Sequence, residues 1–176
     1  MKKLSDVAQT GDIVFLMENS GFWDKVIQFF SGGPETHVCL VYDDKNVFEQ
    51  DTEIGHTHFD DITEYDNEHI RIFRVKNLTD QQRKEVKKQC DWQLNIPYSY
   101  PAFCIQALFS WLPQKGKDWI DGMFDNYNLS KCDKAVTQVM FPATADEFWV
   151  ITSASNPHEL LVDLQKFKKA DEVRLL

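Results

Sequence analysis

The chain has 176 residues and a formal net charge of −9 at pH 7, and 43% of its residues are hydrophobic. This length is typical of one domain that buries about two-thirds of its unfolded surface, so we expect residues 1–176 to form a single domain. The acidic balance disfavours nucleic-acid binding, because neutralising phosphates requires clustered Lys and Arg side chains.

The sequence predicts neither a membrane span nor a secretory signal. No stretch approaches the ~18 consecutive apolar residues that a transmembrane helix needs, and the lysines at the N-terminus are followed by no apolar run. The four cysteines have no CxxC spacing, which is typical of reduced thiols. We therefore expect a cytoplasmic protein in which each cysteine is either a core residue or a reactive thiol.

Strand patterns dominate the first part of the chain. An apolar run after a Gly-Asp turn predicts a buried strand over residues 13–17, and a helical stripe of apolar side chains predicts a helix over residues 22–30. Strands over residues 36–42 and 46–50 flank the turn-forming sequence DDKN, which predicts a hairpin. Period-2 alternation predicts a further strand over residues 69–75.

Helix patterns dominate the remainder. Thr79 and Gln82 form the sequence signature of a capping box, which predicts a helix from Thr79 to about Leu94. The later pattern predicts three more helices: one over residues 102–112, one containing Cys132 that ends before Pro142, and one that begins at Pro157 after a Ser155 or Asn156 cap.

The distribution of these elements predicts the fold class. Strands gather in residues 12–75 and helices in residues 79–165. Segregated runs of this kind are typical of an α+β domain in which helices pack against an antiparallel sheet.

Cys132 is the strongest candidate for a nucleophile. Apolar side chains follow it at helical spacing in the stretch LSKCDKAVTQVM, residues 129–140, which predicts that it lies in the first turn of a helix. Unpaired N–H groups at a helix start favour a negatively charged sulfur. Cys39, Cys90 and Cys104 lie within apolar strand or helix patterns, and we interpret them as structural.

His37 and Glu49 could complete a thiol site. His37 opens the strand that follows the turn-forming sequence GGPET, so its imidazole should lie at the rim of the sheet. Glu49 lies on the second strand of the predicted hairpin and should be near His37. A carboxylate there could hold one ring nitrogen and leave the other for a thiol. A strand-end histidine and a solvated carboxylate stay open as the simpler interpretation.

Seven short motifs occur in an order that is typical of one protein family. In chain order they are GDIVFL, FWDKVIQFF, THVCLVY, VFEQ, LNIPYSYPAF, KCDKAVTQVM and NPHELL, and together they extend over roughly residues 11–162. This order resembles that of the circularly permuted papain-fold hydrolases of the NlpC type, the YaeF/YiiX-like group.

The resemblance implies a circularly permuted papain-like (NlpC-type) fold, with an antiparallel sheet or barrel packed against helices. It implies that Cys132 is the nucleophile, with its own backbone N–H in the oxyanion hole. His37 would be the base and then the acid, and Glu49 would orient it. Tyr98 would line the cleft.

Four positions depart from the family pattern. The Ser-Glu that follows the cysteine in the family is Asp133-Lys134 here, the Asp of the tyrosine motif is Ser99, and Cys39 stands where the family more often has Gly. None of these departures removes a member of the implied triad, and they bear mainly on substrate preference.

The segment GHTHFDD offers a divalent-metal site as a weaker alternative. His56 and His58 would share one face if the segment were a strand, with Asp60 or Asp61 nearby. Because no cysteine or third histidine has fitting spacing, we interpret the segment as a polar loop without a metal. The sequence has no Gly-rich phosphate loop, so we expect no nucleotide or other cofactor.

Two functions from different classes follow. The first is a thiol hydrolase or acyltransferase that splits an amide or ester bond of a small peptide-like or lipid-like substrate through an acyl-enzyme on Cys132. Lecithin:retinol acyltransferase-like relatives share this layout. The second is a non-catalytic binding module that retains the papain-like fold, with Asp133-Lys134 as the mark of altered function. The complete set of Cys132, His37 and Glu49 favours the enzyme.

Overall fold

A single antiparallel sheet organises the structure. The computed structural model describes residues 3–17, 25, 28, 32–50, 55–66, 69–97, 132–146, 148–151 and 156–173. Within them lies a six-stranded sheet in the order β4-β3-β2-β1-β5-β6, and every neighbouring pair is antiparallel. The strands are β1 (Asp12–Leu16), β2 (His37–Val41), β3 (Asn46–Gln50), β4 (Thr57–Asp61), β5 (Ile70–Val75) and β6 (Ala170–Val173).

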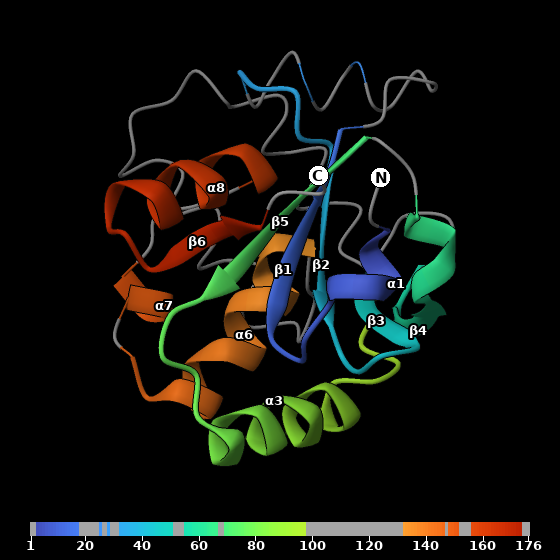
Figure 1. The fold of residues 1–176 in the computed structure, drawn as a ribbon, viewed down its shortest axis with the longest axis vertical. Helices are drawn as coiled ribbons and strands as arrows, with labels where there is room; N and C mark the ends of the chain where they lie inside the picture. Colours follow the sequence, from blue (N-terminus) through green and yellow to red (C-terminus); the bar gives the residue numbers. More distant parts are fainter. Residues whose placement is uncertain are drawn as a thin grey trace.

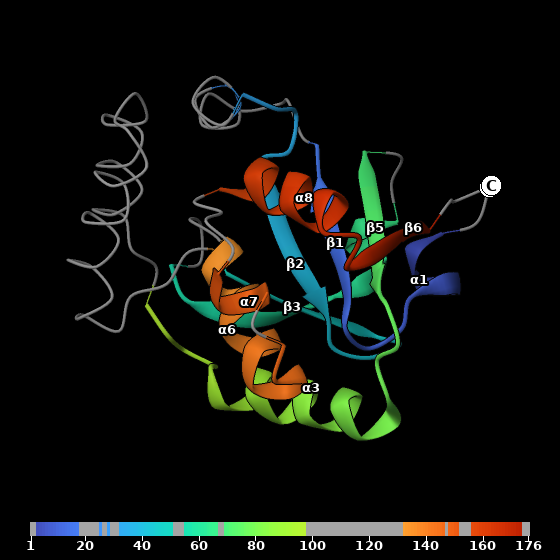
Figure 2. The same ribbon diagram turned by 90° about the vertical axis from the view of Figure 1, so that its left-hand side faces the viewer.

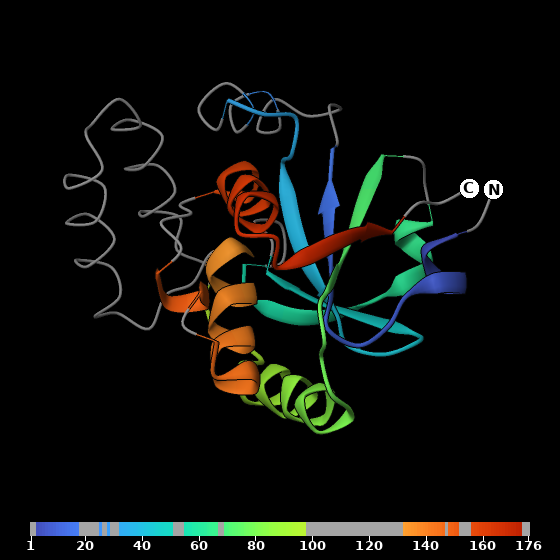
Figure 3. The same cartoon turned by 60° about the vertical axis from the view of Figure 1, so that its left-hand side comes forward.

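Helices cover both faces of this sheet unequally. One face carries α3 (Asp80–Trp92), α6 (Cys132–Thr144), α7 (Phe148–Ile151) and α8 (Pro157–Lys166), whereas the other carries the short α1 (Leu4–Val7) and the 3-10 helix η1 (Ile62–Tyr65). Figures 1, 2 and 3 show the larger helices α3, α6 and α8, together with the short α7, gathered on one side and α1 on the other. The fold is therefore a mixed α+β arrangement, as the sequence predicts.

The alternation of side chains along β1 explains why the sheet is covered on both faces. Ile13 and Phe15 lie in the core beneath the larger helices, and Val14 and Leu16 lie in the core beneath α1 and η1. Successive side chains of a strand point to opposite faces. A strand with four consecutive apolar residues, as residues 13–16 are, is consequently stable only between two layers.

Several predicted elements are confirmed. The β2–β3 hairpin is antiparallel with Leu40 opposite Phe48. The Thr79 side chain accepts from the Gln82 backbone N–H in a complete capping box, and α3 follows at once. Asn156 caps α8 by accepting from the Glu159 backbone N–H. The helix predicted over residues 102–112 lies outside the described residues, as does most of the helix predicted over residues 22–30.

The interpretation of residues 56–61 as a polar loop is wrong. The segment forms β4, and its register places His58 opposite Glu49. The strand is held by its less polar face, where Thr57 is fully buried and Phe59 packs against Phe48 and Tyr42. The polar side chains that suggested a loop occupy the alternate positions.

The predicted end of the helix that contains Cys132 is also wrong. Helix α6 continues through Pro142 to Thr144. A proline inside a helix removes one N–H donor, here the one that would bond to the carbonyl of Gln138. Gln138 and Pro142 both lie on the exposed side of α6, away from the core against which the helix packs.

Candidate active site

His37 and Glu49 lie side by side on neighbouring strands. His37 is the first residue of β2, with 18% of its side chain exposed, and Glu49 lies on β3 with 3% exposed. The hairpin register brings them together, and His37 Nε2 is 2.8 Å from Glu49 Oε2. Because an ionised carboxylate only accepts hydrogen bonds, Nε2 of His37 is the protonated nitrogen of this pair.

Cys132 contacts His37 from the helical layer. It is the first residue of α6 as described, it is 8% exposed, and its side chain is hydrogen-bonded to the His37 imidazole. Since Nε2 of His37 is occupied by Glu49, Nδ1 is the nitrogen available to the thiol. The structure thus brings Cys132, His37 and Glu49 together in that order.

The electrostatics of the group favour charged forms. Burial lowers the pKa of His37, but hydrogen bonds and charge interactions with Cys132 and Glu49 outweigh it and hold that pKa well above its ordinary value. Burial raises the pKa of Glu49, yet hydrogen bonds from His37, His58 and Tyr65 outweigh it and lower that pKa well below the ordinary range. Glu49 therefore stays ionised, and the imidazole of His37 beside it is easily protonated.

His58 and Tyr65 are contacts of Glu49 that the sequence reasoning did not assign. His58 Nε2 lies 3.1 Å from Glu49 Oε1, and the Tyr65 hydroxyl donates to the same carboxylate. The alternation of Thr57 and Phe59 with His58 was a usable signal for β4, because it places His58 on a polar face. No comparable pattern marks Tyr65, which reaches Glu49 from η1.

The remaining cysteines differ from Cys132 in their surroundings. Cys39 and Cys90 are completely buried. Burial raises the pKa of both thiols, for Cys39 together with the charges of Glu49, Cys132 and Asp60. Both are therefore held as neutral thiols. Cys104 and Tyr98, the residue expected to line the cleft, lie outside the described residues.

Asp133 follows Cys132 in α6 and is itself 3% exposed. The departure from the Ser-Glu pattern consequently places a buried carboxylate in the first turn of α6, at the helix end whose dipole favours negative charge.

A second buried glutamate also holds a histidine. Glu35, which is 1% exposed, lies in the segment before β2, and its Oε2 is 2.6 Å from His158 Nδ1 in the first turn of α8. Arg71 Nη1 lies 3.5 Å from the other oxygen of Glu35. Gly33 is packed so closely on His158 that a Cβ there would lie 2.0 Å from Nδ1. This cluster joins α8 to the segment that leads into His37.

Comparison with solved structures gives the fold a counterpart. The chain is similar to a protein from Escherichia coli O157:H7 that is described as metalloprotein yiiX. The two are 18% identical, the match covers 94% of this chain and 87% of that chain, and the TM-score is 0.55. The two chains share a fold. At this level of identity the similarity to yiiX establishes the fold alone.

Sequence comparison finds no relative of this chain. No protein-family model matches the chain, and no curated protein matches it. Among the helices that the structure describes, none has the length and apolar character to cross a membrane.

Proposed function

We propose that the protein is a thiol hydrolase that cleaves an amide or ester bond through an acyl-enzyme on Cys132. The observation that carries the proposal is the position of His37 between the Glu49 carboxylate, 2.8 Å away, and the Cys132 thiol. A thiol, an imidazole and an orienting carboxylate in this order are the requirements of nucleophilic cysteine catalysis. The yiiX-like fold and the order of the sequence motifs support a circularly permuted papain-like arrangement.

The proposed reaction begins with proton transfer from Cys132 to His37. The thiolate attacks the carbonyl carbon of the substrate, a C–S bond forms, and an electron pair moves onto the carbonyl oxygen. When this intermediate collapses, the C–N or C–O bond breaks and the leaving amine or alcohol takes the proton from His37. Water then gives a proton to His37 and attacks the thioester, which releases the acid and restores the thiolate. An acyltransferase would replace this water by an acceptor alcohol or amine.

Glu49 and the start of α6 have supporting roles in this proposal. Glu49 fixes the tautomer and orientation of His37 and stabilises its positive charge during both proton transfers. The backbone N–H of Cys132, at the helix start, would donate to the oxyanion. Tyr98 stays a predicted cleft residue.

The test is the pH dependence of Cys132 alkylation by iodoacetamide, with peptide mapping to separate the four thiols. In the wild type we expect Cys132 to react fast already at about pH 6 to 7, because His37 accepts its proton. In His37→Ala the same reaction should need alkaline pH. Cys39 and Cys90 serve as internal controls and should stay unreactive in the folded protein, because burial raises their pKa values.

A second experiment detects the acyl-enzyme directly. Incubation with p-nitrophenyl esters of short and long acyl chains, followed by mass spectrometry, should show a covalent adduct on Cys132 that is absent in Cys132→Ser. If Cys132 reacts no faster than an ordinary thiol and forms no adduct, the chain is better described as a non-catalytic binding module that retains the fold.

The description of yiiX as a metalloprotein raises the question of a cation in this chain. Glu49, His58 and Asp60 are the one group in the described part of the chain whose donor atoms fit such an ion. An ion held there would add positive charge beside Glu49. The steps proposed above are carried by Cys132 and His37.

A further inference from the structure

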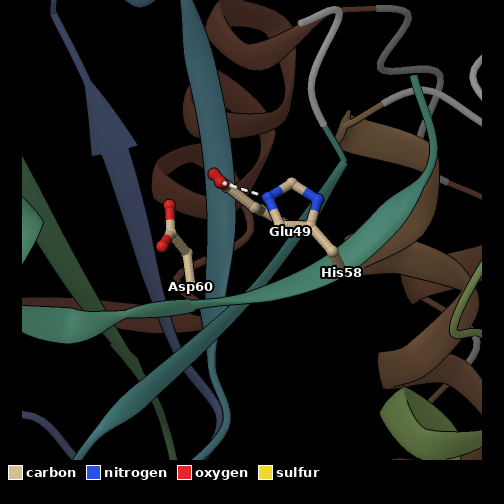
Figure 4. Close-up of side chains that lie close together, drawn as sticks. All are labelled: Glu49, His58 and Asp60. Atoms are coloured by element: carbon tan, nitrogen blue, oxygen red, sulfur yellow. Dashed lines mark ion pairs between the residues drawn. The ribbon is translucent and has the colours of Figure 1, made fainter. Parts of the chain in front are cut away.

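Side chains from β4 converge on the carboxylate of Glu49. His58 lies directly opposite Glu49 in the β3–β4 register, and Asp60 lies two residues further on the same face of β4. One donor atom from each of the three residues lies within 4.8 Å of the other two. Figure 4 shows the three side chains together, with the ion pair between Glu49 and His58 drawn as a dashed line.

The hydrogen bonds of His58 define which of its nitrogens can bind a ligand. Nδ1 lies 3.1 Å from the backbone carbonyl oxygen of His56. A carbonyl oxygen only accepts, so Nδ1 carries a proton, and a neutral His58 has its lone pair on Nε2. This nitrogen lies 3.1 Å from Glu49 Oε1, which is also an acceptor. Two acceptors at this distance are stable only with a positive charge between them, either a proton or a metal ion.

Asp60 completes a donor set for a metal ion. The carboxylate of Glu49 is shared with His37, and the cluster brings a second carboxylate, that of the partly buried Asp60, to the same place. Two carboxylates and one imidazole are suited to a divalent ion. An imidazole whose Nδ1–H is held by a backbone carbonyl, with Nε2 directed at the ligand, is the usual arrangement of a metal-binding histidine.

The donor set also indicates the class of ion. An imidazole nitrogen is a ligand for Zn²⁺, Mn²⁺ and Fe²⁺, whereas Ca²⁺ and Mg²⁺ prefer oxygen alone. Two ligands of a tetrahedral Zn²⁺, each at about 2.1 Å, lie roughly 3.4 Å apart. The three side chains would reach that geometry by small rotations. The cluster lies close to the surface, since 13% of the His58 side chain is exposed and Asp60 is partly exposed, although Nε2 of His58 is itself buried.

We propose that Glu49, His58 and Asp60 bind one divalent transition-metal ion of the Zn²⁺ class. Glu49 Oε1 would hold the ion while Oε2 keeps His37, so the two sites share one carboxylate. The proposal does not rest on the reaction of Cys132.

The experiment is a titration of the full chain with Zn²⁺ by isothermal calorimetry. We expect one ion per chain. His58→Ala and Asp60→Asn should each weaken Zn²⁺ binding by at least about 10- to 100-fold. This is the loss that typically follows when a residue that only supports a metal ligand is removed. His56→Ala is the matched control, since it removes a neighbouring imidazole but keeps the carbonyl that accepts from His58, and it should bind as the wild type does. Far-ultraviolet circular dichroism verifies that each variant is folded.

Two further measurements identify the ligands. Cys132→Ser should retain the affinity of the wild type, and the complex with Co²⁺ should lack a thiolate charge-transfer band. Absence of Zn²⁺ binding up to the millimolar range would overturn the proposal, as would equal affinities in the wild type, His58→Ala and Asp60→Asn. Loss of binding in Cys132→Ser, or a thiolate band, would place the ion on a cysteine instead. Unreactive Cys132 with intact Zn²⁺ binding would count against the hydrolase only.

Discussion

Two buried glutamates in this protein each hold a histidine, and their other partners distinguish them. Glu49 is 3% exposed and lies 2.8 Å from His37, while Glu35 is 1% exposed and lies 2.6 Å from His158. Glu35 also has Arg71, whose charge is permanent. In the described part of the chain Glu49 contacts two histidines and a tyrosine, which gain or lose protons or donate hydrogen bonds without a fixed charge.

This difference separates a structural contact from a candidate active site. Arg71 keeps its charge whatever reacts nearby, so its contact with Glu35 can help to fix α8 against the segment before β2. At Glu49 the positive charge depends on proton transfer between Cys132 and His37. The comparison teaches that a short carboxylate–histidine distance carries little functional meaning until the third partner is known.

The largest expected effect is on the alkylation rate of Cys132, which should depend on Glu49 and not on Glu35. Glu49→Gln preserves shape but removes the charge that stabilises protonated His37, and it should slow Cys132 alkylation at neutral pH by roughly 100-fold. Glu35→Gln should leave the rate within about twofold, because it does not touch His37. Iodoacetamide kinetics with peptide mapping measure both. An equal slowing in the two variants would contradict the comparison.

A second prediction concerns stability. Arg71→Ala leaves the buried carboxylate of Glu35 without its permanent cation and should lower the free energy of unfolding by about 2 kcal/mol, less than for a fully buried pair because Arg71 is partly exposed. Glu172→Gln is the control, since Glu172 contacts the same arginine at 2.8 Å but is 43% exposed. It should cost less than about 1 kcal/mol. Urea unfolding measures the free energy of unfolding of both variants. Similar losses would show that the contact of Arg71 with Glu35 contributes no more to stability than its contact with Glu172.

Gly33 offers a sharper test of the contact between His158 and its surroundings. In Gly33→Ala the new methyl group would overlap His158 Nδ1, and the free energy of unfolding should fall by about 1 to 2 kcal/mol. In a His158→Ala background the same substitution should cost far less, because the clashing ring is gone. A double-mutant cycle measured by urea unfolding gives the coupling, and additive losses would show that His158 is not the cause.

The smallest expected effect is at Tyr65. Tyr65→Phe removes one hydrogen bond to Glu49 and should slow Cys132 alkylation about fivefold, equivalent to about 1 kcal/mol. Tyr42→Phe removes a hydroxyl that donates to Asp91 at 3.1 Å, and it should leave the rate unchanged. If both variants react like the wild type, Tyr65 has only a structural role.

The fold was predictable wherever residues close together in the sequence determine the secondary structure that is observed. The unbroken apolar run of β1, the turn of the β2–β3 hairpin and the caps of α3 and α8 all have causes within a few residues. Strands β4 and β6 were missed because four of the five side chains of β4 and two of the four side chains of β6 are polar. Their positions depend on neighbouring strands that are distant in sequence, such as β5 for β6.

The candidate site divides in the same way. His37 and Glu49 were expected to be close because one hairpin joins them, and the proximity of Cys132 was inferred from family resemblance alone. The contacts of His58 and Tyr65 with Glu49 depend on β4 and η1, whose placement the sequence did not predict. The catalytic roles of the three predicted residues stay predictions.

The pairing of β6 with β5 has a consequence for the tendency of the protein to aggregate. Strand β6 covers the backbone groups of one side of β5, and Asp171 and Glu172 give the outermost strand negative charge. Without residues 170–173, β5 would present the β-prone sequence IRIFRV as an open edge, which is a template for pairing with other chains. We therefore expect that this short acidic strand protects the sheet from aggregation, and that loss of residues 170–173 would make the protein aggregate.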